Sequence, residues 1–310
     1  MTSDISARQD LDRHTVWQSG RLDARNRRPR LLFGRVYEDN AIEQAAFAPG
    51  GRIFCIASGG CTALSLAGER EVVACDINPV QIEYVKRRMA GALPELGTAD
   101  HVMTFLRRLM PIAGWTRNKL NAFLELGDPN EQESYFRAKL DTGRFRAGLA
   151  LLLSPLWLRG IYSSALLSSL PPRFGTVLRK RMERCFAAHP NRTNPYARAL
   201  LLGWDKAPGN ALPEGSSATN IQLVADDAAT YLERCSPQSF DGLSLSNILD
   251  GAGESYRKRL VAAVRRAAQK NAVVVLRSFG EPAPDSTANR AQDDRSMLWG
   301  IVDVRPADSL

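Results

Sequence analysis

The sequence predicts an α/β protein whose doubly wound sheet is split by a helical insertion. Two observations support this fold class. Apolar, β-rich runs alternate with helical patterns in two blocks of the chain, and the long stretch between the blocks shows helical patterns without a strong strand. We expect three parts: a polar, arginine-rich arm or helix over 1–30, a sheet domain built from 31–100 plus 219–310, and a mostly helical insertion over 101–218.

The first block alternates helix and strand, as a βαβ unit does. We expect a helix, strand, helix, strand and helix, over 40–48, 52–60, 61–70, 71–78 and 79–93. The last helix has a clear start, because Asn78 suits the N-cap and Pro79 suits the first helical position. Its apolar residues recur at helical spacing, namely Ile82, Val85, Met89 and Leu93.

The second block resumes the strand pattern after the insertion. We expect strands in NIQLVADD, FDGLSLSN, NAVVVLRSF and MLWGIVDV, with a helix in ESYRKRLVAAVRRAAQK. The run NAVVVL is apolar throughout, which is typical of a strand buried on both faces of a parallel sheet.

Charge is distributed unevenly along the chain. The net charge is +8, and residues 101–200 alone carry 16 basic and 6 acidic residues. Such a region suggests an anionic partner, which could be a membrane surface, nucleic acid or a phosphorylated substrate. The alternative is a solvated, arginine-rich helical surface.

Cysteine and histidine usage indicates a cytoplasmic protein without a metal site. The five cysteines show no CxxC spacing, and none of the three histidines lies at metal-ligand spacing from a cysteine or another histidine. The first residues lack the apolar run of a secretory signal. We therefore expect reduced thiols and no bound metal.

The carboxyl ends of the predicted strands carry candidate ligand-binding residues, because ligands bind at that edge of such sheets. The first strand ends in Ala57-Ser58-Gly59-Gly60, where glycines let the backbone approach a ligand closely, although a plain tight turn is the alternative. Asp76 follows Gly59 by 17 residues and begins the run Asp76-Ile77-Asn78. An acid at this position can accept both hydroxyls of an adenosine ribose.

Three further strand ends complete this edge. Asp226-Asp227 could accept the adenine amino group, while Asp227 could equally cap the helix that follows. The fourth strand ends in Ser246-Asn247 and the fifth in Arg277-Ser278. The set suits S-adenosylmethionine better than NAD, because a dinucleotide needs a free helix N-terminus for its pyrophosphate.

Several motifs make the comparison more specific. They are FGRVYEDN, IASGGCTALSLA, VVACDINPVQ, SLSNILD, LRSF and DRSMLWG. Together they resemble the betaine-lipid synthase family, the S-adenosylmethionine:diacylglycerol 3-amino-3-carboxypropyltransferases, over most of the chain and most strongly over 33–90 and 220–300. In that family an acid–histidine pair lies near the end of the fourth strand, where this chain has Ser246-Asn247 with Asp250 beyond.

The resemblance implies a class I methyltransferase-like fold with S-adenosylmethionine as co-substrate. It also implies transfer of the 3-amino-3-carboxypropyl group to a hydroxyl or amine acceptor, diacylglycerol in betaine-lipid synthesis, with release of methylthioadenosine. Such an enzyme would lie in the cytoplasm or peripherally on the inner membrane face.

The catalytic candidates follow from this chemistry. Arg277 could clamp the carboxylate of the methionine moiety, or could belong to a structural ion pair. Tyr37, Glu38 and Asp39 could fold over the site, where Glu38 or Asp39 holds the ammonium or takes a proton, although Asp39 could also cap the 40–48 helix. An alcohol needs a base, and Glu38, Asp250 and His14 are the candidates. Asp294-Arg295-Ser296 could close the other side, or form a surface turn.

The insertion contains the most apolar stretch, Ala147 to Phe174, interrupted by Pro155, Arg159 and Gly160. Its longest uninterrupted run is shorter than the roughly 20 residues that span a bilayer. Together with nearby bases it could dock on anionic lipid; those bases are Arg173, Arg179, Lys180 and Arg181. Four side chains could contact acyl chains or form the insertion's own core: Leu151, Leu152, Trp157 and Leu158.

Two other functions are compatible with the sequence. One is an S-adenosylmethionine-dependent methyltransferase, which would release S-adenosylhomocysteine instead of methylthioadenosine. The other is a nucleic-acid-binding or modifying protein that uses the basic segment. The absence of a recognised RNA- or DNA-binding motif and of interleaved aromatic and basic residues argues against nucleic acid as a partner.

Overall fold

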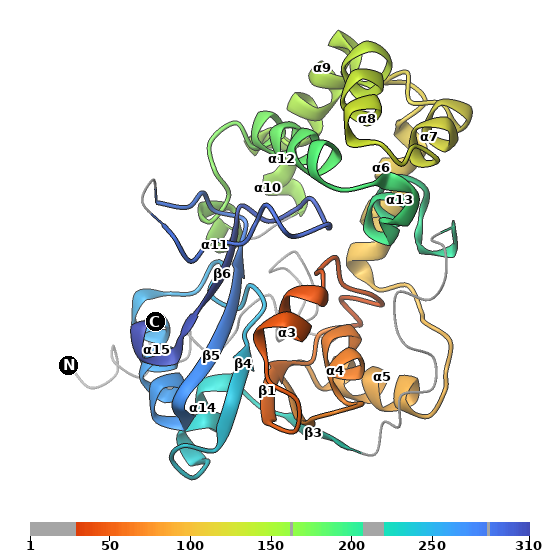
Figure 1. Cartoon of the computed structure of the whole chain (residues 1–310). Coiled ribbons are helices and arrows are strands. Elements are labelled where there is room, and N and C mark those ends of the chain that lie inside the picture. The colour runs from red at the N-terminus through yellow and green to blue at the C-terminus, as the bar shows by residue number, and fades with distance from the viewer. Residues whose placement is uncertain (1–28, 162–163, 207–219, 284–285) are drawn as a thin grey trace, which may run out of the picture.

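The computed structural model describes residues 29–161, 164–206, 220–283 and 286–310, and its centre is a six-stranded sheet (Figure 1). The strand order is β3-β2-β1-β4-β5-β6. The first five strands in this order are parallel, and β6 is antiparallel to β5. The strands are β1 Arg52–Ile56, β2 Glu71–Asp76, β3 Ile221–Ala225, β4 Phe240–Ser244, β5 Ala268–Ser278 and β6 Ile301–Pro306. This is a Rossmann-like α/β fold, as the alternation of strands and helices predicts.

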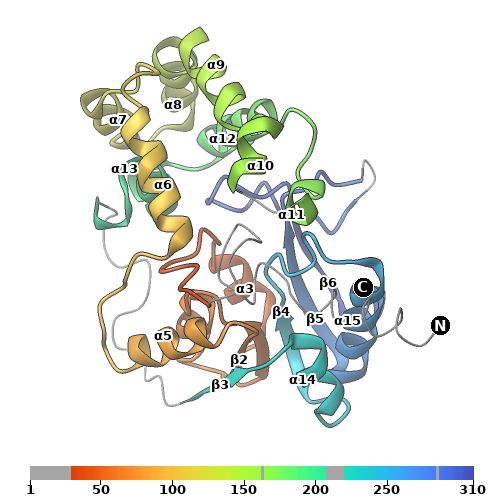
Figure 2. The same ribbon diagram turned by 180° about the vertical axis from the view of Figure 1, so that it is seen from behind.

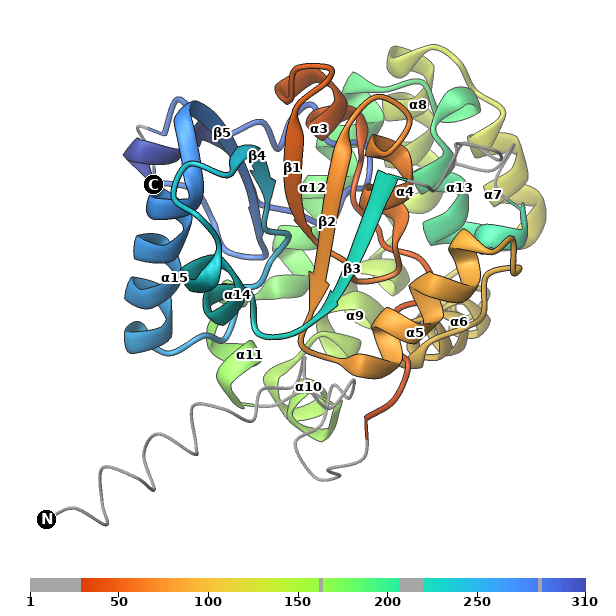
Figure 3. The same ribbon diagram turned by 90° about the horizontal axis from the view of Figure 1, so that it is seen from below.

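Helices cover both faces of the sheet, which makes it doubly wound (Figure 3). One face packs against α3 (Ala41–Ala46), α4 (Cys61–Leu66) and α5 (Pro79–Met89), and the other against α14 (Ala228–Arg234) and α15 (Glu254–Ala267). A hydrophobic core lies on each face of the sheet. The side chains of alternate β1 residues pack into these two cores, because successive side chains of a strand point to opposite faces. Ile53 and Cys55 lie in the first core, whereas Phe54 lies in the second.

The local signals for helix starts are confirmed. The side chain of Asn78 accepts a hydrogen bond from the Val80 backbone nitrogen at 3.0 Å, and Pro79 is the first residue of α5. Asp227 caps α14 through the Thr230 backbone nitrogen at 2.9 Å. Both side chains therefore satisfy donors that the first turn of a helix leaves unpaired.

Two strand boundaries differ from the prediction. β5 begins at Ala268, which pairs with Phe240 ahead of a register shift in the β4–β5 ladder. β6 begins at Ile301 and not at Met297. Met297 has a φ of 70°, and its side chain is buried in the core of the helical region, so the chain reaches the sheet only afterwards.

The described residues between α5 and β3 are helical and contain no strand. They form α6 Thr98–Leu109, α7 Arg117–Leu124, α8 Pro129–Tyr135, the π-helix η1 Phe136–Leu140, α9 Gly143–Leu152, α10 Pro155–Ile161, α11 Ser164–Ser168, α12 Phe174–Ala188, the 3₁₀-helix η2 Asn191–Thr193, α13 Pro195–Leu202 and the 3₁₀-helix η3 Trp204–Lys206. A last 3₁₀-helix, η5 Ala307–Ser309, follows β6. The helical region has its own aromatic core, which includes Trp115, Phe123, Phe136 and Phe186.

Arg181 joins this helical region to the carboxyl edge of the sheet. It lies on α12, is buried, and donates to the carbonyl oxygens of Leu298 at 2.7 Å and Phe279 at 2.8 Å. Phe279 directly follows β5. The helices therefore lie next to the edge where candidate ligand residues were predicted.

Three further observations concern the whole described chain. No helix among the described residues combines the length and apolar character needed to cross a bilayer. All five cysteines are free thiols, and four of them are buried. His14 and residues 1–28 of the predicted arm lie outside the described residues.

Candidate functional site at the carboxyl edge of the sheet

The strand order reverses between β1 and β4, and this defines the crevice where α/β sheets bind ligands. Cys55 pairs with Ser244, so the loops that follow the two strands leave the sheet side by side. These loops contain Ala57-Ser58-Gly59-Gly60 on one side and Ser246-Asn247 on the other. The topology thus brings together two of the predicted groups.

The glycine turn after β1 is required by the protein's own packing. Gly60 has a φ of 81°, and a Cβ there would lie 3.0 Å from the Val85 Cγ1. A Cβ on Gly59 would lie 3.1 Å from the carbonyl oxygen of Gly34. The close backbone approach that we predicted for a ligand at Gly59 is therefore made by Gly34.

The segment around Gly34 crosses this edge and is fixed at several points. Tyr84 donates its hydroxyl to the Gly34 carbonyl at 2.8 Å, and Asp100 accepts from the backbone nitrogens of Gly34 at 2.8 Å and Gly97 at 2.9 Å. A side chain at Gly34 is excluded, since its Cβ would overlap the Glu95 carbonyl. These contacts position the residues that follow Gly34, including Glu38, near the carboxyl end of β4.

Asp76 ends β2 and holds the glycine turn. Its two carboxylate oxygens accept from the backbone nitrogens of Ser58 at 3.0 Å and Asn78 at 2.9 Å. Burial raises the pKa of Asp76 to about 7, although both hydrogen bonds act in the opposite direction. Within the described part of the chain no basic side chain forms an ion pair with it. Ile77 is partly buried, and the Asn78 side chain is occupied by its capping role and by the Arg30 carbonyl.

The two acids after β3 have partners of their own. Asp226 pairs with Arg234, and Asp227 accepts from the Tyr256 hydroxyl at 2.7 Å in addition to capping α14. The capping interpretation of Asp227 is therefore confirmed. A contact with an adenine amino group would have to share an oxygen that is already hydrogen-bonded.

Arg277 lies in a buried ion-pair cluster. Its guanidinium is fully buried and pairs bidentately with Glu43, with an Nη2–Oε2 distance of 2.9 Å, and Nη2 also donates to the Asp39 carbonyl at 3.2 Å. Burial, the largest influence, lowers its pKa, but the contacts with Glu43 leave the pKa of Arg277 above its ordinary value. The structural ion pair, and not an open carboxylate clamp, is the arrangement present here.

Two carboxyl groups with a raised pKa, those of Glu38 and Asp250, lie near the carboxyl end of β4. Glu38 accepts from the Ser246 hydroxyl at 2.5 Å, and burial raises its pKa against the opposing charge of Arg277, whose Nη1 is 3.7 Å away. Burial also raises the pKa of Asp250, while its hydrogen bonds lower it. Those bonds come from the Ser278 hydroxyl at 2.6 Å, the Phe279 backbone nitrogen at 3.1 Å and the Asn247 amide at 3.3 Å.

Tyr37 is directed away from these carboxyl groups. Its hydroxyl lies 3.4 Å from both the Ala199 carbonyl and the Arg107 guanidinium, and its ring packs against Trp204 at a centroid distance of 5.2 Å. Burial raises the pKa of Tyr37 to about 12. The residue thus lies at the contact with α6 and α13, whereas its neighbour Glu38 faces the sheet.

The segment 294–296 packs against the residues before α3. Arg295 pairs bidentately with Asp39, at 2.6 Å for Nη2–Oδ1, and Asp39 also accepts from the Ala41 backbone nitrogen at 3.2 Å at the start of α3. Asp294 accepts from the Ser296 backbone nitrogen at 2.7 Å, while its second oxygen lies 3.8 Å from the Arg277 Nε. Both predicted flanks of the site therefore meet around Arg277.

The sequence patterns did not identify Glu43 and Asp100 as residues of the site. Glu43 is fully buried and is the main partner of Arg277. Glu43 precedes the buried Phe47 by four residues, and residues at this spacing lie on the same face of a helix. A charged residue on the apolar face of a short helix was therefore the sequence signal that could have identified Glu43. Asp100 gave no comparable signal, because one of its two partners, Gly34, is distant in sequence.

The structure corrects part of the predicted lipid-facing set. Arg181 and Leu158 are buried, and Arg179 pairs with Asp141 at 3.0 Å, so these three do not form an open surface. Leu152 is partly buried. Four members of the set are exposed: Leu151, Trp157, Arg173 and Lys180.

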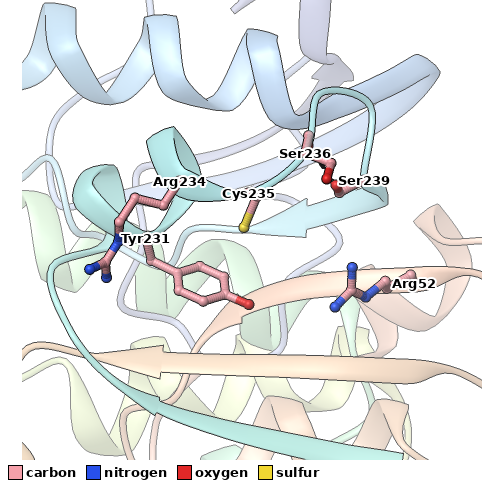
Figure 4. A pocket seen from close by; sticks show the side chains of 6 residues that line it. All are labelled: Arg52, Tyr231, Arg234, Cys235, Ser236 and Ser239. Carbon is pink, nitrogen blue, oxygen red and sulfur yellow. Dashed lines mark hydrogen bonds between the residues drawn. The ribbon is translucent and has the colours of Figure 1, made fainter.

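A surface pocket of about 360 Å³ lies elsewhere, at the amino ends of β1 and β4 (Figure 4). It is lined by Arg52, Tyr231, Arg234, Cys235, Ser236 and Ser239. Arg52 is the first residue of β1, and its guanidinium pairs with Glu71 at 2.9 Å. None of the predicted site residues lines this pocket. Among the described residues we find no group of three or more histidine, cysteine or acidic side chains arranged to hold a metal ion.

Comparisons with known proteins were negative: no family model, no curated protein and no solved structure matches the chain. The assignment of a function therefore depends on the residues at the carboxyl edge.

Proposed function

We propose that this protein binds S-adenosylmethionine at the carboxyl edge of β1, β2 and β4 and transfers its 3-amino-3-carboxypropyl group to a hydroxyl or amine acceptor. Diacylglycerol is the acceptor that the resemblance to betaine-lipid synthases implies. The methyltransferase-like assignment of the fold is part of this proposal. It is compatible with a sheet that reverses its order between β1 and β4 and ends in an antiparallel strand.

Asp76 is the observation that carries the proposal. Each of its carboxylate oxygens accepts one backbone hydrogen bond, and an ionised carboxylate offers about four acceptor positions. Two positions therefore remain for a pair of vicinal hydroxyls such as those of a ribose. Asp76 is partly buried and lies beside the glycine turn at the switch point, where fold-level rules place a nucleoside.

The transfer needs a group that receives the acceptor's proton. The acceptor oxygen forms a bond to the γ-carbon of the methionine moiety, the carbon–sulfur bond breaks, and its electron pair remains on sulfur as methylthioadenosine leaves. We assign the released hydroxyl proton to Glu38. Burial raises the pKa of Glu38 above its ordinary value, which makes its carboxylate a stronger proton acceptor.

Glu38 is favoured over Asp250 by its hydrogen bonds. Asp250 already accepts three hydrogen bonds from described residues, one of them from the Phe279 backbone. Glu38 accepts one, from Ser246, and its Oε2 accepts none from the described residues. A carboxylate oxygen with unused lone pairs can take a proton without first losing a hydrogen bond.

Product analysis tests the proposal directly. The protein is incubated with S-adenosylmethionine and diacylglycerol, and the nucleoside products are separated by mass spectrometry. Methylthioadenosine together with a lipid enlarged by the four-carbon amino acid unit supports the proposal. S-adenosylhomocysteine would instead identify a methyltransferase, and absence of binding in calorimetry would contradict the site itself.

A matched pair of variants locates the binding site. Asp76→Asn should abolish the calorimetric signal of S-adenosylmethionine. Asp241→Asn is the control, because Asp241 also accepts a backbone hydrogen bond, from Arg52 at 2.7 Å, but lies at the opposite end of the sheet. Equal loss of binding in both variants would contradict the placement at Asp76.

A further inference from the structure

Three large apolar side chains are exposed together on the helical region. Leu151, one residue before the end of α9, is 59% exposed, and Leu156 and Trp157 at the start of α10 are 80% and 50% exposed. The two helices are joined by a tight turn, in which the Ser154 backbone nitrogen donates to the Leu151 carbonyl at 3.1 Å. We name these three residues, with the exposed bases described next, the α9–α10 surface.

The chain segment that contains these residues carries charge of one sign. Residues 142–182 contain no aspartate or glutamate and seven basic residues. Arg181 is buried and Arg179 is engaged with Asp141, which leaves five exposed bases. These are Arg144, Arg146, Arg159, Arg173 and Lys180. Arg146 also pairs with Asp141, at 2.7 Å, while the other four form no ion pair within the described residues.

We propose that the α9–α10 surface docks on a bilayer that carries anionic lipids. Exposed leucine and tryptophan side chains beside arginine and lysine are the composition of helices that lie in a membrane interface. The bases supply attraction to anionic headgroups, and the apolar side chains enter the boundary between headgroups and acyl chains. Self-association through this surface is disfavoured, since it would bring two basic surfaces together.

The position of α11 connects this surface to the candidate site. Figure 2 shows α10 and α11 between α9 and the sheet. Ser169, directly after α11, accepts from the Gly251 backbone nitrogen at 2.7 Å, and Gly251 follows Asp250. A lipid leaving the bilayer at α10 would thus meet the carboxyl edge near Asp250. The delivery of a lipid acceptor to the site rests on the proposed function, whereas the docking on the bilayer does not.

Vesicle co-sedimentation of the full chain tests the docking. Vesicles of phosphatidylcholine alone are compared with vesicles of phosphatidylcholine and phosphatidylglycerol. We expect binding to the anionic vesicles that weakens as salt is added, and a loss of roughly fivefold for each of Arg159→Gln and Lys180→Gln. Leu156→Asp and Trp157→Asp should each reduce binding at least tenfold.

A control variant removes an equally exposed side chain elsewhere. Ile112 is 75% exposed and follows α6, so Ile112→Asp should leave vesicle binding unchanged. Thermal melting and S-adenosylmethionine calorimetry on each variant show that fold and nucleoside site are intact. Equal effects of Ile112→Asp and Leu156→Asp, binding to RNA but not to vesicles, or a dimer that Leu156→Asp dissociates would each overturn the proposal. The Asp76 experiment is unaffected by any of these results.

Discussion

Asp76→Asn is expected to change the stability of the protein in opposite directions at low and high pH. Burial desolvates this carboxyl group, no basic side chain among the described residues forms an ion pair with it, and its pKa is raised from the ordinary value of 3.8 to about 7. Between these two pH values the folded protein holds a proton that the unfolded chain releases. The free energy of unfolding of the wild-type protein therefore falls as the pH rises through this range.

The magnitude follows from the two pKa values. Their difference corresponds to about 4 kcal/mol at 1.36 kcal/mol per pH unit, and this cost is complete above pH 7. Asparagine removes it because the amide carries no charge. The amide has one acceptor oxygen for two backbone donors, those of Ser58 and Asn78, and the lost hydrogen bond costs about 1–3 kcal/mol. We therefore expect a net gain of about 1–3 kcal/mol at pH 8 and a net loss of about 1–3 kcal/mol at pH 4.

Urea denaturation at the two pH values measures this change of sign. In the same proteins calorimetry with S-adenosylmethionine should show a wild-type affinity that falls about tenfold per pH unit below pH 7, because the charged carboxylate is the better acceptor for the ribose hydroxyls. Asp76→Asn should show no binding at any pH. A destabilisation of equal size at pH 4 and pH 8 would refute the burial argument, and wild-type affinity in the variant would refute the ribose assignment.

Three further substitutions test the neighbouring groups. Arg277→Met leaves Glu43 buried without its cation, so urea denaturation should show a loss of about 3–5 kcal/mol; unchanged stability with selective loss of S-adenosylmethionine over methylthioadenosine would instead identify a clamp. Glu38→Gln keeps an acceptor for Ser246 and should lower turnover at least about 100-fold without changing the dissociation constant, whereas normal turnover would assign the base to Asp250. Asp227→Ala removes the α14 cap and should cost about 1 kcal/mol of stability, and a large drop in S-adenosylmethionine affinity would show an adenine contact that capping does not explain.

The fold could be predicted to the extent that its signals are local. Asn78 with Pro79 starts α5, and the apolar run before Arg277 forms most of β5, because caps and hydrophobic runs act within a few residues. The start of β6 could not be predicted in this way. The sequence around Met297 has the pattern of a strand. Its side chain, however, is buried in the core of the helical region, which is distant in the sequence.

The sequence predicted where the residues of the candidate site lie better than it predicted what their side chains do. Strand ends identify Asp76 and Ser246 as residues of one edge, because parallel strands end together. Whether Arg277 is free for a ligand depends on Glu43, and this pairing joins residues far apart in the chain. Spacing carries no information about such a pair, so the clamp and the ion pair could not be separated before the structure.

The buried charges also explain why the helical region and the sheet depend on each other. The segment before α3 and the segment before β6 are tied together by Asp39 with Arg295 and by the Trp299 indole, which donates to the Tyr37 carbonyl at 2.9 Å. The helical region holds the second segment, since Asn194 donates to the Arg295 carbonyl at 3.0 Å. Loss of these helices would expose the Arg277 cluster to water and release the segment that carries Glu38. The candidate site is therefore a property of both parts.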